Sequence, residues 1–168
     1  MSCFEVFGPL PIARAHRLCA ADQTPLWAAA NAEARGLAGA IGCYVFALQH
    51  GARLVPWFVG STLDDFASVV FQPAQTAIYD RCMVASTAAP VLFLLPLCTA
   101  NARNFSGARK TGGGAIGWLE QGLMGLMFAR SARLSNAEGL RAFGRKPVPE
   151  ALVPNTLARP FRAMVPVV

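Results

Sequence analysis

Positive charge is distributed unevenly along this sequence, and cationic side chains are the groups that contact the phosphates of nucleic acids. Residues 1–100 hold five Arg against six acids, whereas residues 101–168 hold ten Lys or Arg against three acids. The two parts therefore carry net charges of −1 and +7, which together give the formal charge of +6. A basic half of this kind suits a phosphate backbone, and a solvated basic surface is the alternative.

Five of these ten basic residues lie in a polar loop, residues 99–114, or in the last turn of the helix expected after it. Three consecutive glycines, residues 112–114, could let backbone amides approach a phosphate. The loop lacks the Lys-Ser/Thr pair of a P-loop, so a flexible connection is the better interpretation. The candidate nucleic-acid contacts are Arg103, Arg109, Lys110, Arg130 and Arg133.

Histidine and cysteine chemistry is not indicated. The five cysteines, at positions 3, 19, 43, 82 and 98, form no CxxC pair and no His/Cys ligand spacing. Reduced, packed thiols of a cytoplasmic protein explain them best. His16 and His50 have no partner at ligand or triad spacing, so both are expected at the surface.

A β-hairpin is predicted near the middle of the chain. Residues 41–48 and 54–60 are short, aromatic and β-branched segments typical of strands. The connection between them contains Gly51, which suits a tight turn. Pro56 cannot donate a hydrogen bond to a neighbouring strand, and this predicts an edge position or a bulge.

Helices are predicted on both sides of this hairpin. Thr24 followed by Pro25 predicts the start of a helix over residues 26–37. After the hairpin, Ser61 or Thr62 is expected to cap a helix whose first turn is acidic.

Pro73 is expected to end or kink the helix that follows the hairpin, with a second helical piece over residues 76–83. The clearest helix covers residues 116–133, where apolar residues recur at helical spacing. The last 31 residues, 138–168, are rich in proline and are expected to be mostly extended.

The longest uncharged stretch lies between Cys82 and Arg103 and raises the question of a membrane span, because the mean hydropathy is +0.40. Pro90 and Pro96 interrupt the stretch, and its front half is small and polar. Its compact apolar part, residues 91–97, has the length of a buried strand. A third strand is therefore predicted, with a small membrane-associated protein as a lesser alternative.

The order of these elements, together with two tripeptides in the hairpin, resembles the GIY-YIG nuclease family. Gly42-Cys43-Tyr44 looks like the GIY element, and Phe58-Val59-Gly60 looks like the YIG element. Glu120 matches the glutamate of the family's last helix, and Asn136 is a candidate for an asparagine that follows it. The resemblance covers residues 40–137, about three-fifths of the chain.

The resemblance implies cleavage of a phosphodiester with one divalent metal, Mg²⁺ or Mn²⁺. In that scheme Glu120 is the metal ligand, and Tyr44 acts as the general base or positions the attacking water. Glu120 is the only acid between Asp80 and Glu138, which favours a special role, and a solvent-facing helix acid is the alternative. The alternative for Tyr44 is a strand aromatic with its hydroxyl at the surface.

Two positions depart from the family pattern. Phe58 stands where the second tyrosine belongs, so the ring is kept and the hydroxyl is missing. The loss of such a group commonly costs about a hundredfold in rate. The arginine expected early in the helix after the hairpin is also missing, and Arg81, further along, is better explained as a solvated residue.

The resulting prediction is a soluble, cytoplasmic α+β protein with a small, three-stranded, mostly antiparallel sheet flanked by helices. Residues 1–39 form an N-terminal extension with a helix, residues 40–137 the GIY-YIG-like domain, and residues 138–168 a C-terminal extension. The predicted partner is nucleic acid, with DNA preferred, and cleavage is expected to be weakened. A non-catalytic nucleic-acid-binding or regulatory module is the alternative.

Overall fold

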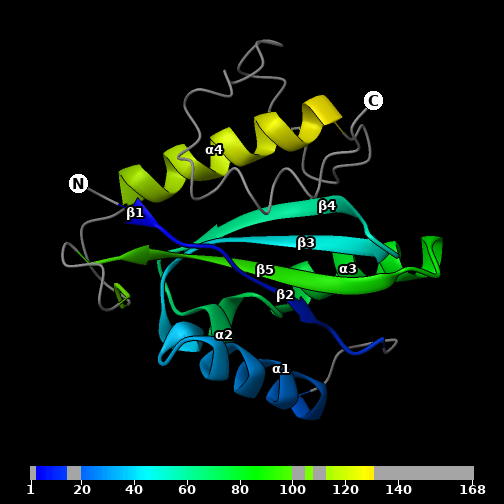
Figure 1. Ribbon diagram of the computed structural model, residues 1–168, viewed down its shortest axis with the longest axis horizontal. Helices are drawn as coiled ribbons and strands as arrows, with labels where there is room; N and C mark the ends of the chain where they lie inside the picture. The colour runs from blue at the N-terminus through cyan, green and yellow to red at the C-terminus, as the bar shows by residue number, and fades with distance from the viewer. Residues whose placement is uncertain (1–2, 15–19, 100–104, 108–112, 131–168) are drawn as a thin grey trace.

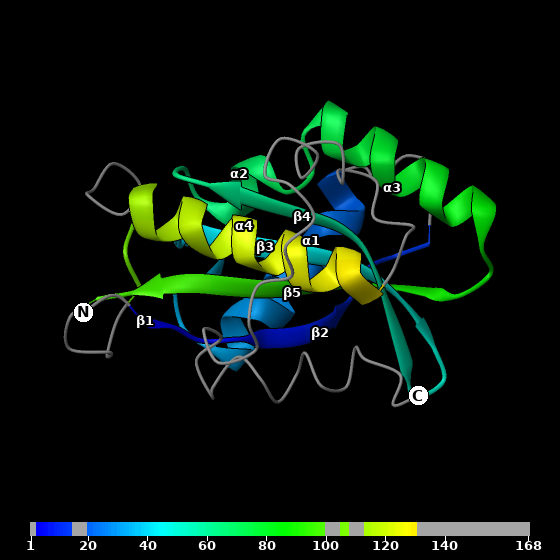
Figure 2. The same ribbon diagram turned by 90° about the horizontal axis from the view of Figure 1, so that it is seen from above.

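The computed structural model describes residues 3–14, 20–99, 105–107 and 113–130. These residues form an α+β fold in which an antiparallel sheet lies between two layers of helices (Figure 1). Helix α4 (Gly113–Arg130) covers one face of the sheet. The other face carries α1 (Ala20–Glu33), α2 (Phe66–Val69) and α3 (Pro73–Ala85), as the view from above in Figure 2 also shows.

The predicted hairpin is present, and both strands extend further toward the turn than expected, although the first strand begins one residue later than predicted. Strand β3 (Gly42–His50) pairs antiparallel with β4 (Arg53–Thr62), and Gly51 takes the positive φ of 60° that the tight turn requires. Both predictions from Pro56 are confirmed. Strand β4 lies at an edge of the sheet, and the register shifts opposite Pro56, where Trp57 is the extra residue.

The third strand, β5 (Ala89–Cys98), confirms the prediction of a strand around residues 91–97 and pairs antiparallel with β3. Pro96 is tolerated inside this central strand for a local reason. Since Leu97 directs its N–H to Ile41 on the β3 side, the nitrogen of Pro96 faces the opposite side. On that side one neighbouring strand ends at Phe4 and the next begins at Phe7, so Pro96 lies opposite the gap between the two strands.

The sheet is wider than the predicted three strands. Strands β1 (Cys3–Phe4) and β2 (Phe7–Pro11) lie end to end along the free side of β5, both antiparallel to it. The glycine and prolines of this segment argue against a regular central strand, and β2 is in fact irregular, with a register shift between Phe7 and Leu10. It is also an outer strand, where such residues are accepted.

Three helix boundaries differ from the predictions. Helix α1 begins at Ala20 and contains Pro25, so Thr24 is not its cap. Ser61 and Thr62 belong to β4, and the cap of α2 is Asp65, whose Oδ1 accepts the Ser68 N–H at 2.8 Å. A short loop therefore separates β4 from α2, because Thr62 hydrogen-bonds the backbone of Asp64 instead.

Pro73 stands at the first turn of α3, after α2 has ended at Val69, which agrees with the expected break and second helical piece. Helix α4 begins three residues before the predicted start, and its predicted end at residue 133 lies outside the described residues. In the described part of the chain, no helix has the length and apolar character needed to cross a membrane.

Two hydrophobic clusters form, one on each face of the sheet. Alternate residues of β3 supply both, so that Cys43, Val45 and Ala47 face α4 while Tyr44 and Phe46 face α1, α2 and α3. The N-terminal segment belongs to the second cluster through strand and helix residues: Leu10, Ile12, Leu26 and Ala30. The described part of residues 1–39 therefore contributes to the same core as the hairpin.

Arg14 connects the N-terminal segment to the C-terminal end of α3 through hydrogen bonds. Its guanidinium donates hydrogen bonds to the carbonyls of Met83 and Ala88, each at 2.7 Å, and also to Ser86. Carbonyls at a helix C-terminus lack partners within the helix, and a cation there also suits the helix dipole. The contact fixes α3 against the sheet, and α3 is one of the elements that build the candidate site.

Candidate active site

The two family-like tripeptides lie directly opposite each other in the hairpin. Tyr44 of β3 pairs with Gly60 of β4, and Phe46 pairs with Phe58. Partners in a ladder project to the same face of a sheet. Tyr44, Phe58 and Gly60 therefore share the face that α3 covers, and the ring centroids of Tyr44 and Phe58 are 5.9 Å apart.

Gly60 is required by the Tyr44 side chain. A Cβ atom at this position would lie 2.6 Å from the Tyr44 hydroxyl oxygen and 2.8 Å from Cε1 of Phe58, distances that real Cβ atoms do not show. The phenol of Tyr44 therefore rests directly over the Gly60 backbone. Glycine is required at position 42 as well, because a Cβ atom there would overlap the backbone of Leu95 in the neighbouring strand.

Glu120 is anchored to the residue that follows Gly60. The Ser61 hydroxyl donates a hydrogen bond of 2.8 Å to Oε2 of Glu120, and both side chains are half-buried. Ser61 projects to the α4 face, since its neighbour Gly60 faces the other way. Ser61 binds one of the two carboxylate oxygens, Oε2.

Tyr44 and Glu120 approach the same strand from opposite faces of the sheet. The phenol lies over Gly60 on one face, and the carboxylate is bound to Ser61 on the other. The two groups still act on each other electrostatically. Burial is the main cause that raises the pKa of Tyr44 to about 12, and the negative charge of Glu120 adds to the increase, while a hydrogen bond from Gln75 opposes it.

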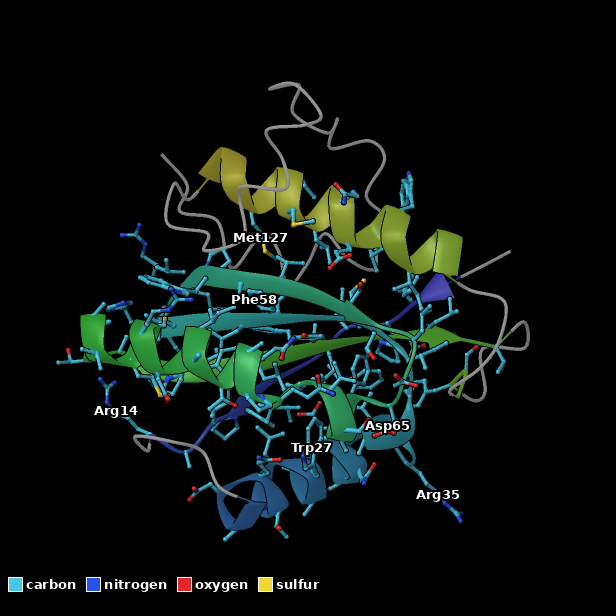
Figure 3. The ribbon with its side chains drawn as sticks, turned by 180° about the vertical axis from the view of Figure 1, so that it is seen from behind. Arg14, Trp27, Arg35, Phe58, Asp65 and Met127 are labelled. Atoms are coloured by element: carbon cyan, nitrogen blue, oxygen red, sulfur yellow. The ribbon has the colours of Figure 1, made fainter. Side chains whose placement is uncertain are left out.

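The surroundings of Tyr44 are aromatic and closed. Tyr44 is 1% exposed, and the ring of Tyr79, from α3, stacks on Phe46 with a centroid separation of 4.2 Å and an angle of 19°. Tyr79 also meets Phe58 edge to face, at 6.4 Å and 76°. Figure 3 labels Phe58 on the sheet.

Three polar atoms of α3 are buried without a hydrogen-bond partner among the described residues: Oε1 of Gln75, the hydroxyl of Tyr79 and Oδ1 of Asp80. The side chain of Gln75 also acts on Tyr44, where it opposes the rise in the pKa of the hydroxyl. Burial raises the pKa of Tyr79 well above its usual value, and the nearby Tyr44 adds to this. A buried hydroxyl with no partner costs stability, so its presence calls for an explanation.

The metal ligand predicted at Glu120 has few companions among the described residues. In the described part of the chain, no three His, Cys, Asp or Glu side chains come together to hold an ion. Zinc needs several protein ligands, whereas Mg²⁺ commonly keeps most of its waters and is held by one or two carboxylates plus phosphate oxygens. Glu120, whose half-buried carboxylate is bound to Ser61 through one oxygen, could supply the single carboxylate that Mg²⁺ requires.

The cysteines behave as packed thiols. Cys43, Cys82 and Cys98 are buried and free. Burial raises the pKa of Cys43, with a smaller contribution from Glu120, and burial raises the pKa of Cys82 to about 12 although Arg14 opposes this. Thiols with such values stay protonated and are poor nucleophiles. The prediction that the cysteines are packed is confirmed for these three.

Other predicted site residues are less well placed. Arg81 is exposed on α3, and its Nε donates to the Ala77 carbonyl at 3.3 Å, which agrees with a solvated helix residue. Arg130 is the last residue of α4. The remaining predicted residues lie outside the described part of the chain: Arg103, Arg109, Lys110, Arg133 and Asn136.

Sequence reasoning missed three residues of this region: Ser61, Gln75 and Tyr79. Ser61 was expected to cap a helix, but its position directly after Phe58-Val59-Gly60 already put it beside any group that approaches that strand. The rarity of tyrosine could have pointed to Tyr79, because the chain contains only two tyrosines and the other is Tyr44. Gln75 carried no signal in the sequence.

Comparison of the chain with protein-family models, with curated proteins and with solved structures found no match in any of the three.

Proposed function

We propose that this chain is a GIY-YIG-like domain that acts on nucleic acid, with DNA as the preferred partner, and that its metal-dependent phosphodiester cleavage is weak. The observation that carries the proposal is the 2.8 Å hydrogen bond between Ser61 and Glu120. It brings the lone carboxylate of α4 to the strand that bears Phe58-Val59-Gly60, on the opposite face of the sheet from Tyr44.

In this proposal, Glu120 holds the metal through its carboxylate, and Ser61 fixes the orientation of that carboxylate. Bound Mg²⁺ or Mn²⁺ would supply positive charge to the phosphate and lower the pKa of a water ligand. The basic part of the chain, residues 101–168, would bind the phosphate backbone through candidates such as Arg109 and Lys110.

Tyr44 acts here as a hydrogen-bonding group and not as the general base. A phenol with a pKa of about 12 is protonated at neutral pH in all but about one molecule in 10⁵. It can donate to an oxygen atom but rarely accepts a proton. Since Phe58 provides no second hydroxyl, proton abstraction has no efficient group, and slow cleavage follows.

A nicking assay on supercoiled and branched DNA, with Mg²⁺ or Mn²⁺, tests the proposal. We expect slow cleavage that stops in EDTA and falls at least about a hundredfold in Glu120→Gln, which keeps the shape of the side chain and removes its charge. Asp64→Asn, which removes an exposed acid near the end of the same strand, is the control and should cleave like the wild type. Cleavage that survives Glu120→Gln would refute the metal role.

The alternative is a nucleic-acid-binding or regulatory module without chemistry, and the closed environment of Tyr44 favours it. Binding would then weaken steeply with salt, need no metal and persist in Glu120→Gln. Phe58→Tyr separates the two, because it restores a hydroxyl to the centre of the site. A gain in cleavage indicates a weakened enzyme, whereas unchanged binding with no cleavage indicates the module.

A cytoplasmic location is part of the same proposal. Cys43, Cys82 and Cys98 are free thiols in the core, a state that reducing compartments maintain. Recovery of the protein from the soluble fraction without detergent would dispose of the third hypothesis, a small membrane-associated protein.

A further inference from the structure

The end of the sheet where β3 turns into β4 carries exposed basic side chains. Arg53 follows the turn and pairs with His50, so both side chains project to the same face of the sheet. Leu48, two residues before His50, faces the layer of α1, α2 and α3. The alternation along a strand therefore directs His50 and Arg53 to that layer as well, and both residues are exposed.

The N-terminal segment brings a third basic side chain to this end. The last paired residues of β3 and β5 are Gln49 and Ala89. The guanidinium of Arg14 donates a hydrogen bond of 2.7 Å to the carbonyl of Ala88, the residue just before that pair. Because neighbouring strands lie about 4.8 Å apart, Arg14 is held beside the strand that adjoins the hairpin turn.

Helix α3 supplies a fourth basic side chain. Arg14 also donates a hydrogen bond to the Met83 carbonyl, so the C-terminal end of α3 lies at the same end of the sheet. Arg81, two residues before Met83, is exposed, whereas the preceding Asp80 is half-buried and has a buried carboxylate oxygen. We call this group of exposed residues the basic end: Arg14, His50, Arg53 and Arg81.

Acidic side chains gather at the opposite end of the sheet, where Gly42 pairs with Thr62. The acids placed there by the strand register and by the bond to Ser61 are Glu5, Asp64, Asp65 and Glu120. The other described acids are Asp22, Glu33 and Asp80. A polyanion is therefore repelled by one end of the sheet and attracted by the other.

The basic part of the sequence continues from the basic end. Helix α4 ends at Arg130, and Figures 1 and 2 both show its C-terminal end on the same side of the molecule as the turn between β3 and β4. Residues 131–168, which follow, hold six Lys or Arg against two acids. The fold thus brings arginines from residues 1–100, a part with a net charge of −1, to the place where the basic segment begins.

We propose that the basic end is a docking surface for the phosphate backbone of nucleic acid, continuous with the basic segment that follows α4. The inference rests on the proposed function and deepens it, because it places the main contact away from Glu120. Arg53 and Ser61 are about 25 Å apart along β4, at about 3.3 Å per residue. Docking at the basic end therefore needs neither Glu120 nor a metal, and contacts to phosphates alone carry no sequence preference.

Fluorescence anisotropy of a labelled DNA duplex of mixed sequence, measured on the full chain in EDTA, tests the proposal. We expect Arg53→Gln and Arg81→Gln each to raise the Kd about tenfold at about 0.1 M salt. The slope of log affinity against log salt should fall by about 1 for each arginine removed. Arg14 is left intact, because its loss would unfold the end of α3.

The matched control is Arg35→Gln, which removes an equally exposed arginine at the other end of the sheet, as Figure 3 shows beside Arg14. It should leave the Kd and the salt slope unchanged. Arg53→Lys should keep most of the affinity, since a point charge is enough to neutralise a phosphate. Glu120→Gln should bind DNA at least as well as the wild type. Circular dichroism and urea midpoints equal to those of the wild type verify that the variants fold.

The outcomes separate this inference from the proposed function. If the wild type binds DNA and the double variant of Arg53 and Arg81 binds it equally well with the same salt slope, the basic end is refuted and the proposed function stands. If the expected losses occur but the wild type never nicks DNA, the basic end stands and cleavage fails. If the wild type binds neither DNA nor RNA, both fail. Binding of polyglutamate as tight as that of DNA indicates an acidic protein partner and also overturns the inference.

Discussion

The two faces of the sheet are packed with different kinds of side chain. The α3 face is aromatic and tight, with Tyr44, Phe58 and Tyr79 in contact and a glycine beneath the Tyr44 phenol. The α4 face is aliphatic, with methionines such as Met127 packed between α4 and the sheet (Figure 3). Its polar feature is Glu120, held at the edge strand by Ser61.

The proposed site is therefore divided between two layers. An aromatic cluster with little free space holds a hydroxyl in one position, because every neighbour is in a fixed rotamer. An aliphatic layer with methionine adapts to changes in volume. Precise placement is therefore a property of the α3 face, and the α4 face contributes charge. The predictions below test this contrast, beginning with the largest effect.

Adding one methyl group beneath Tyr44 should destabilise the protein strongly. In Gly60→Ala the new Cβ would lie within 3 Å of the Tyr44 and Phe58 side chains, and both are buried. We expect a loss of about 3 kcal/mol in the free energy of unfolding, measured by urea denaturation. Gly122→Ala on α4 is the control, since its Cβ meets no atom within 4 Å, and alanine there should stabilise by about 0.5–1 kcal/mol.

Equal effects at the two glycines would contradict the contrast between the faces. A small loss in Gly60→Ala would mean that Tyr44 can move aside, and the phenol would not then be a fixed element of a site.

The tightness of the α3 face also predicts a dependence of stability on alkaline pH. The pKa of Tyr44 is raised from 10 to about 12 in the folded protein, so the folded state holds its proton more firmly than the unfolded state. The resulting stability is fully present below pH 10 and is lost as the pH rises toward 12. A tenfold change in proton affinity is worth about 1.4 kcal/mol, so the hundredfold change at Tyr44 contributes about 3 kcal/mol.

Urea denaturation at pH 9 and at pH 11 measures this effect, and Tyr44→Phe isolates it. The variant should lose less stability between the two pH values than the wild type, although Tyr79 and Cys82 keep their own contributions. An identical loss in both proteins would show that the Tyr44 hydroxyl is solvated in the folded state, contrary to its 1% exposure.

The sequence predicted the parts of the fold that depend on local patterns. The hairpin, the third strand and the long helix all follow from apolar periodicity and turn residues, and Pro56 alone indicated both the edge and the bulge. The end-to-end strands β1 and β2 were missed, because Gly8, Pro9 and Pro11 discourage regular pairing and only the partner β5 makes it possible.

The candidate site was predictable where it rests on strand register and was not where it rests on helix placement. Tyr44, Phe58 and Gly60 share a face because their strands are adjacent and in register. Tyr79 arrives from α3, and nothing local determines how that helix docks. The capping of α2 shows the same limit, since Ser61 and Asp65 are both good cap residues and the tertiary contact with Glu120 retains Ser61 in the strand.

The smallest predicted effect concerns Ser61 and tests the α4 face. Ser61→Ala removes the 2.8 Å hydrogen bond to Glu120, and since both side chains are half-buried, the free energy of unfolding should fall by only about 1 kcal/mol. Ser61→Thr keeps the hydroxyl on a β-branched side chain that suits a strand, so it should be as stable as the wild type. The loss in Ser61→Ala should disappear in the Glu120→Gln background if the bond depends on the charged carboxylate. A loss of the same size in both backgrounds would mean that Ser61 stabilises the strand by itself, and the carboxylate would then have no fixed position at this edge of the sheet.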